Sequence, residues 1–143
     1  MIAVDTNVLL YAHRQDSPFH SQAKEWLTRL AEGRAQWAIP WTCLHEFLSI
    51  ASNPRVYQPP GSMDAAIAQV DSWLESPTLT VLRETHDHWP VLTELLRAAD
   101  VRGAGVHDAR IAALCITHGV TEILTLDRDF SRYPQLAMRS LDS

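Results

Sequence analysis

The chain has 143 residues, of which 46% are hydrophobic, and a formal net charge of −5 at pH 7. A chain of this length is about one domain and can bury enough surface to fold without a metal or a disulfide. The negative charge argues against a protein that binds nucleic acid through net charge alone, because phosphate contacts normally come from clustered Lys and Arg. A nucleic-acid enzyme stays open, since arginine supplies almost all the positive charge and can form local basic patches.

The two cysteines, Cys43 and Cys115, each lie within an apolar helical pattern without a second cysteine nearby. This favours buried free thiols and a reducing, cytoplasmic environment. No apolar run approaches the roughly 20 residues that span a bilayer, and Asp5 interrupts the apolar start of the chain. We therefore expect neither a signal peptide nor a membrane anchor. Since no repeat or linker divides the sequence, we expect one domain over residues 1–143.

Short apolar runs alternate with helical spacing along the whole chain. Strands are predicted at residues 2–4, 37–40, 79–82, 122–126 and, as a last edge strand, within 136–141. Helical spacing falls between them, at residues 8–12, 23–30, 44–51, 66–74, 89–96 and 106–116. This alternation predicts an α/β fold with a mainly parallel sheet and right-handed crossovers.

Short polar residues stand where several of these helices should begin. Thr6 and Asn7 are suited to cap the first helix, and Thr42 is suited to cap the helix that carries Glu46. For the second helix we expect a start at Ser17-Pro18 and an end at Gly33. Residues 53–63 contain three prolines and a glycine, which predicts a surface loop.

Acidic residues stand at the same end of several predicted elements. Asp5 follows the first strand, Asp127 and Asp129 follow the fourth, and Glu46 and Asp108 lie in early turns of helices. In a parallel sheet, the carboxyl ends of strands and the starts of the following helices share one edge. We therefore expect Asp5, Glu46, Asp108 and Asp127 in one crevice, with Asp129 close by. Carboxylates grouped in this way repel one another unless a cation neutralises them, and an oxygen-rich site suits Mg²⁺ or Mn²⁺.

Each acid taken alone has a simpler explanation. Acids near helix starts complement the helix dipole, and an Asp after a strand often caps a helix or makes a turn. His45 and His107 directly precede Glu46 and Asp108, but neighbours along a helix point in different directions. We therefore expect no histidine in the metal site and no zinc.

The ordered motifs resemble those of the PIN-domain family and, more narrowly, of the VapC ribonuclease toxins of type II toxin–antitoxin pairs. The motifs are Asp5-Thr6-Asn7, Glu46 after the second strand, His107-Asp108-Ala109 and Thr125-Leu126-Asp127-Arg128-Asp129-Phe130. The resemblance covers the whole chain. It implies a three-layer α/β/α sandwich with a central, mainly parallel sheet, and cleavage of RNA by a metal-dependent endoribonuclease.

The same resemblance implies roles for individual residues. Asp5, Glu46, Asp108 and Asp127 match the catalytic, metal-binding acids, with Asp5 and Asp108 as the firmest ligands of Mg²⁺ or Mn²⁺. Asp129 matches a more variable acid, while Thr6, Asn7 and Thr125 match positions that support the acids through hydrogen bonds. The family also implies a VapB-like antitoxin that occludes or disrupts the site, and frequently a homodimer.

The chemistry expected of such a site is in-line attack by a metal-activated water on the phosphodiester, which leaves 5′-phosphate and 3′-hydroxyl ends. Two alternatives stay open. Haloacid-dehalogenase-like phosphatases also place an Asp after the first strand and bind Mg²⁺, but they typically have a second Asp where this chain has Asn7. The second alternative is a non-catalytic interaction domain. Arg102, Arg110 and Arg128 stand near the acids, where they could contact RNA or form salt bridges.

Overall fold

Five short strands form one sheet in the computed structural model, which describes residues 1–142. The strands are β1 (Ile2–Val4), β2 (Trp37–Pro40), β3 (Leu79–Leu82), β4 (Glu122–Leu124) and β5 (Ala137–Arg139). The helices are α1 (Thr6–His13), α2 (His20–Glu32), α3 (Trp41–Ala51), α4 (Met63–Leu74), α5 (His88–Ala98) and α6 (Gly105–Thr117), with a 3₁₀ helix η1 (Arg128–Arg132). Ser143, the last residue of the expected domain, lies outside the described residues.

The strand order is β3-β2-β1-β4-β5, and all four pairings are parallel. β1 is therefore central. From it the chain first builds outwards through β2 and β3, and later returns to the other side of β1 with β4 and β5. The carboxyl ends of β1 and β4 flank the point where this direction reverses, which is where α/β sheets open a crevice for ligands.

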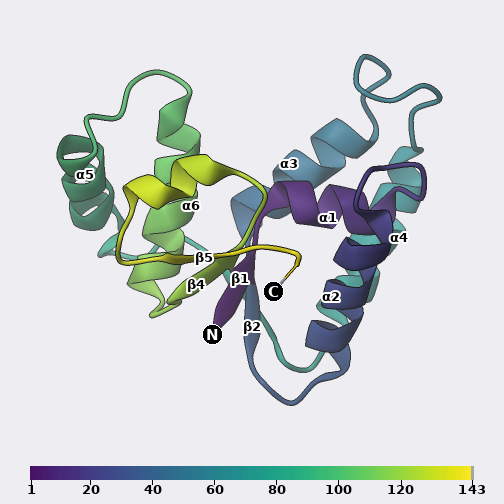
Figure 1. Cartoon of the computed structure of the whole chain (residues 1–143), viewed down its shortest axis with the longest axis horizontal. Helices are drawn as coiled ribbons and strands as arrows, with labels where there is room; N and C mark the ends of the chain where they lie inside the picture. The colour runs from purple at the N-terminus through teal and green to yellow at the C-terminus, as the bar shows by residue number, and fades with distance from the viewer. Residues whose placement is uncertain (143) are drawn as a thin grey trace.

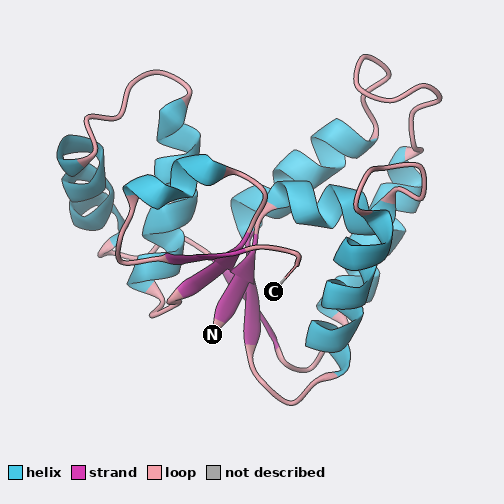
Figure 2. Cartoon of the chain, in the orientation of Figure 1, coloured by secondary structure: helices cyan, strands magenta, loops and turns pink. Residues whose placement is uncertain are grey.

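Helices cover both sides of this sheet, as the three-layer prediction requires (Figure 1). Helices α5 and α6 lie on one side, and α2 and α4 lie on the other, with the strands gathered between them (Figure 2). The layers are held together by fully buried side chains such as Trp37, Phe47 and Phe130. Phe47 makes edge-on contacts with the rings of His13 and Trp73, at centroid distances of 5.2 and 4.9 Å.

Two helix starts differ from the prediction. Helix α2 begins at His20, after Phe19 in the left-handed region (φ 60°), and Ser17 does not cap it. The Ser17 hydroxyl instead donates to the backbone oxygens of Tyr11 and Arg14, because it lies against the last turn of α1. Helix α3 begins at Trp41, so Thr42 lies inside its first turn and is not its cap.

The first helix also begins earlier than predicted. Asp5 is its N-cap, and Thr6 and Asn7 are its first two residues. At the other end of the chain, β4 stops at Leu124, two residues before the predicted end, because the chain turns there towards η1. The last strand is shorter than the span 136–141, but it does form an edge strand, beside β4.

The remaining features agree with the sequence. Gly33 follows the last residue of α2, and residues 53–62 form the predicted loop. Cys43 and Cys115 are both buried free thiols. None of the described helices is long and apolar enough to cross a bilayer.

Candidate active site

Asp5 lies at the carboxyl end of β1 with its carboxylate almost fully buried. Its backbone N–H donates to the Leu124 carbonyl of β4 (3.0 Å), which extends the ladder between the two strands. One carboxylate oxygen, Oδ1, accepts the Thr6 backbone N–H at 2.8 Å, and the other, Oδ2, accepts the Thr125 hydroxyl at 2.7 Å. Asp5 thus caps α1, which is the simpler explanation for an Asp after a strand, and it also lines the pocket together with the other acids.

The environment of Asp5 opposes its ionisation. Burial raises the pKa of its carboxyl from 3.8 to about 6, although the hydrogen bonds from Thr125 and Thr6 act in the opposite direction. The negative charges of Glu46 and Asp127 raise the pKa further. A carboxylate that is buried among like charges gains stability from any cation placed beside it.

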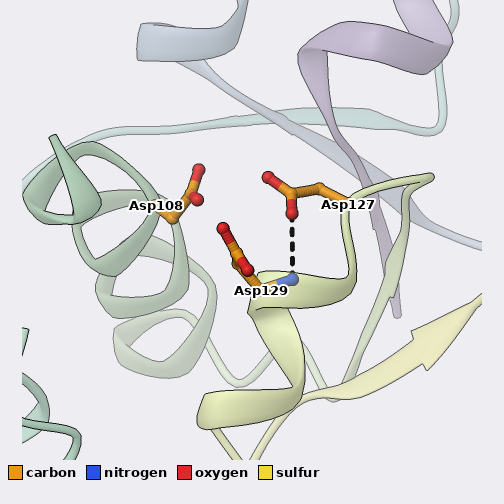
Figure 3. Close-up of side chains that lie close together, drawn as sticks. All are labelled: Asp108, Asp127 and Asp129. Carbon is orange, nitrogen blue, oxygen red and sulfur yellow. Dashed lines mark hydrogen bonds between the residues drawn. The ribbon is translucent and has the colours of Figure 1, made fainter.

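Three more aspartates meet on the other side of the crevice. Asp108 comes from the first turn of α6, Asp127 from the segment after β4, and Asp129 from η1. Each offers one carboxylate oxygen, and these oxygens all lie within 4.8 Å of one another. Figure 3 shows the three side chains converging. Asp127 is fixed by the Asp129 backbone N–H, which donates to its Oδ1 at 2.9 Å.

Asp108 is the member of this group that is most strongly perturbed. Its pKa is raised from 3.8 to about 7, first by partial burial and then by the negative charges of Asp127, Asp5 and Asp129. When no cation is present, this carboxyl is therefore protonated more readily near neutral pH than an ordinary aspartate.

Glu46 approaches from the opposite wall. It lies in the second turn of α3, and its Oε2 accepts the Thr6 hydroxyl at 3.3 Å. Together the acids line a pocket of about 190 Å³. The lining residues are Asp5, Thr6, Asn7, Leu10, Glu46, Ile50, Asp108, Ile111 and Asp127. The four acids expected in one crevice thus share it, with Asp129 bound to Asp127 at its edge.

The supporting residues differ in what they do. Thr125 links two acids, because its hydroxyl donates to Asp5 and accepts the Asp127 backbone N–H at 2.9 Å. Thr6 similarly contacts Asp5 and Glu46. Asn7 makes no such hydrogen bond among the described residues, and its Oδ1 is buried without a partner. Asn7 is one of the residues that line the pocket.

This donor set fits a hard divalent cation. The polar lining consists of carboxylates, an amide and a hydroxyl, with no Lys or Arg to neutralise the acids. The acidic cluster found in the part of the chain that the structure describes consists of Asp108, Asp127 and Asp129. Of the arginines expected near the acids, Arg102 and Arg110 form salt bridges with Asp100 and Glu84.

One neighbour of the site was not foreseen. Cys43 lies on α3 with its Sγ 3.9 Å from Asp5 Oδ1, and the thiol is fully buried. Burial, followed by the negative charge of Asp5, raises the pKa of this thiol well above its ordinary value, so it stays protonated. An apolar helical pattern predicts burial of Cys43, but it does not reveal which side chain the thiol contacts.

Comparison with known proteins places this geometry in a family. The sequence profile of the PIN domain matches residues 2–136. Ribonuclease VapC43 of Mycobacterium tuberculosis is 34% identical over 139 residues, which cover 97% of this chain and 94% of that protein. Ribonuclease VapC37 of the same species is 32% identical over 133 residues, which cover 93% and 92% of the two chains.

Two solved structures share the fold. One is VapBC2 from Rickettsia felis, bound to a DNA fragment from its promoter, with a TM-score of 0.70 at 19% identity and coverage of 98% of both chains. The other is M. tuberculosis VapC20, described as a Sarcin-Ricin loop cleaving toxin, with a TM-score of 0.66 at 21% identity and coverage of 92% of this chain and 93% of VapC20. With its acids, its sheet topology and these relatives in agreement, the chain belongs to the PIN-domain family and stands among its VapC proteins.

Proposed function

We propose that this protein is an endoribonuclease of the VapC type, the toxin of a VapBC pair, and that it hydrolyses RNA phosphodiesters. The observation that carries the proposal is the convergence of Asp5, Glu46, Asp108 and Asp127 on one pocket at the switch point of the sheet. Its relatives over nearly the full chain are named ribonucleases. The alternative of a haloacid-dehalogenase-like phosphatase loses its support, because the chain is a PIN domain and has Asn7 in place of the second Asp.

Within this function, Asp5 and Asp108 would hold Mg²⁺ or Mn²⁺ together with Asp127, with Glu46 and Asp129 at the margins. The chemistry that a bound divalent cation supplies is activation of water at neutral pH and stabilisation of the negative charge that develops on the phosphate. Hydrogen bonds within the protein fix the proposed ligands before a metal binds. Both oxygens of Asp5 are held by donors, which fixes the orientation of the carboxylate.

Glu46, on the α3 side of the pocket, would orient the attacking water. The Thr6 hydroxyl donates to Glu46, which keeps its carboxylate beside α1 in the lining of the pocket. An acceptor in that position can receive a hydrogen bond from a water and align it with the phosphate. Leu10, Ile50 and Ile111 supply apolar surface around the acids, which limits access of bulk water.

The partner we propose is a VapB-like antitoxin that covers this site, in line with the VapBC assembly of the similar R. felis structure. We also propose that residues 1–143 act as one nuclease domain, that the toxin forms a homodimer, and that it works in the cytoplasm. The two buried free thiols are compatible with a reducing compartment.

Cleavage of RNA by purified variants tests this function. We expect Asp5→Asn and Asp108→Asn each to lower the rate by roughly 100-fold or more while the circular dichroism spectrum is kept, because each removes a metal ligand. Asp64→Asn, which changes an exposed acid on α4, is the matched control and should cleave like the wild type. The products should carry 5′-phosphate and 3′-hydroxyl ends. Equal cleavage by all variants, or 2′,3′-cyclic phosphate ends, would contradict the proposal.

A further inference from the structure

Residues 53–61, the middle nine residues of the connection between α3 and α4, form a loop whose two ends rest on the last turn of α3. The Asn53 backbone N–H donates to the Ile50 carbonyl, and the Gly61 backbone N–H donates to the Ala51 carbonyl, both at 3.1 Å. Ile50 is one of the residues that line the acidic pocket. The 53–61 loop therefore leaves and rejoins the protein body beside one wall of this pocket.

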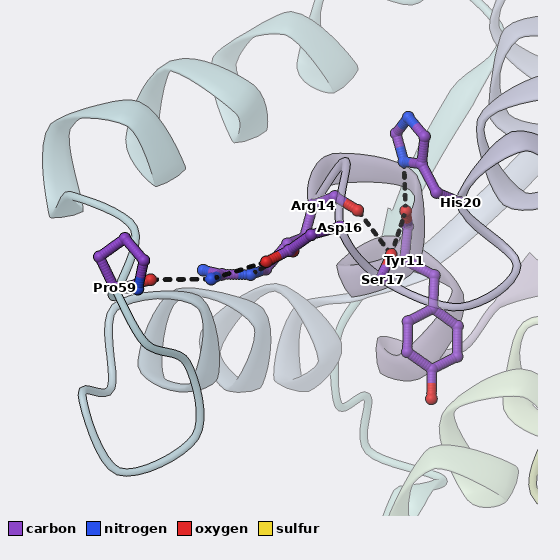
Figure 4. A network of polar contacts seen from close by, with 6 residues as sticks. All are labelled: Tyr11, Arg14, Asp16, Ser17, His20 and Pro59. Atoms are coloured by element: carbon purple, nitrogen blue, oxygen red, sulfur yellow. Dashed lines mark hydrogen bonds and ion pairs between the residues drawn. The ribbon is translucent and has the colours of Figure 1, made fainter.

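Arg14 fixes the middle of the loop. This residue follows α1, and its Nη2 donates to the Pro59 carbonyl at 2.8 Å, while its guanidinium lies 3.9 Å from the centroid of the Tyr57 ring. Asp16 accepts a hydrogen bond from the Arg14 Nε at 2.7 Å and orients the group further (Figure 4). Because one planar side chain is held from three directions, the loop has a defined position relative to α1, the helix that Asp5 caps.

Arg55 is the charged residue that this loop presents to solvent. Its backbone N–H donates to the Asn53 side chain at 2.9 Å, which fixes the turn from which it extends. Across residues 1–142 its guanidinium has neither a hydrogen bond nor an ion pair, whereas Arg110, on the other side of the pocket, is bound to Glu84. Arg55 is thus an uncommitted cation on a held loop that leaves the protein beside Ile50, a residue of the pocket wall.

We propose that Arg55 binds a phosphate of the RNA strand where it leaves the pocket on the α3 side, and that Arg14 positions it by holding the 53–61 loop. This rests on the proposed ribonuclease function. A chain of net charge −5 with an acidic pocket repels a polyanion, so substrate binding needs a cation close to the pocket that the acids do not neutralise. Arginine presents a planar fork that matches phosphate, and a loop ordered in advance loses less entropy when RNA binds.

Binding of an uncut RNA tests this directly. In the Asp5→Asn background, which keeps the RNA intact, we would measure the anisotropy of a fluorescein-labelled single-stranded RNA of mixed sequence at several salt concentrations. Adding Arg55→Gln should weaken binding roughly three- to tenfold and lower the slope of log Kd against log salt by about 0.7, the value for one phosphate contact on a single strand. Arg55→Lys should keep most of the slope.

Two further variants sharpen the test. Arg34→Gln removes an exposed arginine that precedes β2, at the amino ends of the strands, whereas the pocket lies at their carboxyl ends. This variant should leave affinity and slope unchanged. Arg14→Gln keeps Arg55 but releases the loop, and should cause a smaller loss of affinity. Unchanged affinity in Arg55→Gln would overturn the proposal and point to the antitoxin as the partner of this loop, and an equal loss in Arg34→Gln would overturn it as well. Cleavage by the wild type is measured separately, so a failure of the ribonuclease function is distinguishable from a failure of this contact.

Discussion

Both carboxylate oxygens of Asp5 are engaged by donors, and one of these donors, Thr125, also receives a hydrogen bond from the backbone of Asp127. A single hydroxyl thus ties the end of β1 to the segment that delivers the second acid. Thr125 is itself 3% exposed, so no water can take its place without a rearrangement. The Thr125 hydroxyl thus helps to orient the Asp5 carboxylate and opposes the rise of its pKa that burial causes.

Replacing Thr125 tests this link. In Thr125→Val the pKa of Asp5 should rise above about 6, because the hydrogen bond that lowers it is lost. The acidic limb of the pH–rate profile for RNA cleavage should then move to higher pH, and the rate at pH 7 should fall by roughly tenfold. Thr125→Ser, which keeps the hydroxyl, should restore the profile. Superimposable profiles for the valine variant and the wild type would show that the hydrogen bond has no role.

The raised pKa of Asp5 also predicts how metal-free stability depends on pH. Between its unfolded value of 3.8 and its folded value of about 6, the native state holds a proton that the unfolded chain has lost. The stabilisation from this proton is complete below pH 3.8 and is lost as the pH rises through 6. Compared with Asp5→Asn, the wild type should therefore lose about 2 kcal/mol of unfolding free energy between pH 4 and pH 8. Urea unfolding of both proteins at each pH measures the difference, and a difference that stays constant with pH would refute it.

At the scale of elements, helix α3 has two roles: one face lines the pocket, and the other packs into the core. One face carries Glu46 and Ile50 into the pocket, and the other packs Phe47 into the core against His13 and Trp73. The sequence reveals this helix through its apolar spacing, but it does not reveal the starts of α2 and α3. Ser17 has the chemistry of a cap, yet its hydroxyl donates to the carbonyls of Tyr11 and Arg14 at the end of α1. Which hydrogen-bond partner a side chain takes depends on the packing of the helices, and it cannot be read from the local sequence.

Truncation of the core face of α3 should destabilise the whole domain. Phe47→Ala removes a fully buried ring and should lower the free energy of unfolding by about 3–5 kcal/mol, from lost burial and the cavity left behind. Ile67→Ala on α4, where the side chain is 45% exposed, should change it by no more than about 0.5 kcal/mol. Chemical denaturation followed by tryptophan fluorescence gives both values. Similar losses in the two variants would mean that α3 does not anchor the pocket to the core.

At the scale of the whole molecule, the parallel sheet explains why residues as far apart as Asp5 and Asp127 could be placed together from the sequence. Each follows a strand, and all strands of a parallel sheet point their carboxyl ends to the same edge, so the shared edge needs no knowledge of strand order. The strand order itself was not predictable, because nothing in short apolar runs states that β1 lies between β2 and β4. The buried amide of Asn7 and the thiol beside Asp5 likewise depend on packing between elements.

We propose that the acids at the carboxyl ends of the strands hold a divalent cation. Titration of the metal-free protein with Mn²⁺ at pH 7.5, followed through the thermal midpoint, tests this most directly. We predict that Mn²⁺ raises the midpoint of the wild type, by the equivalent of about 2.7 kcal/mol at a concentration 100 times its Kd. The rise should be smaller at pH 5, where Asp108 and Asp5 hold protons, and it should persist in Asp64→Asn but vanish in Asp108→Asn. A midpoint that Mn²⁺ does not move, or moves equally in Asp108→Asn and the wild type, would contradict a metal site at these acids.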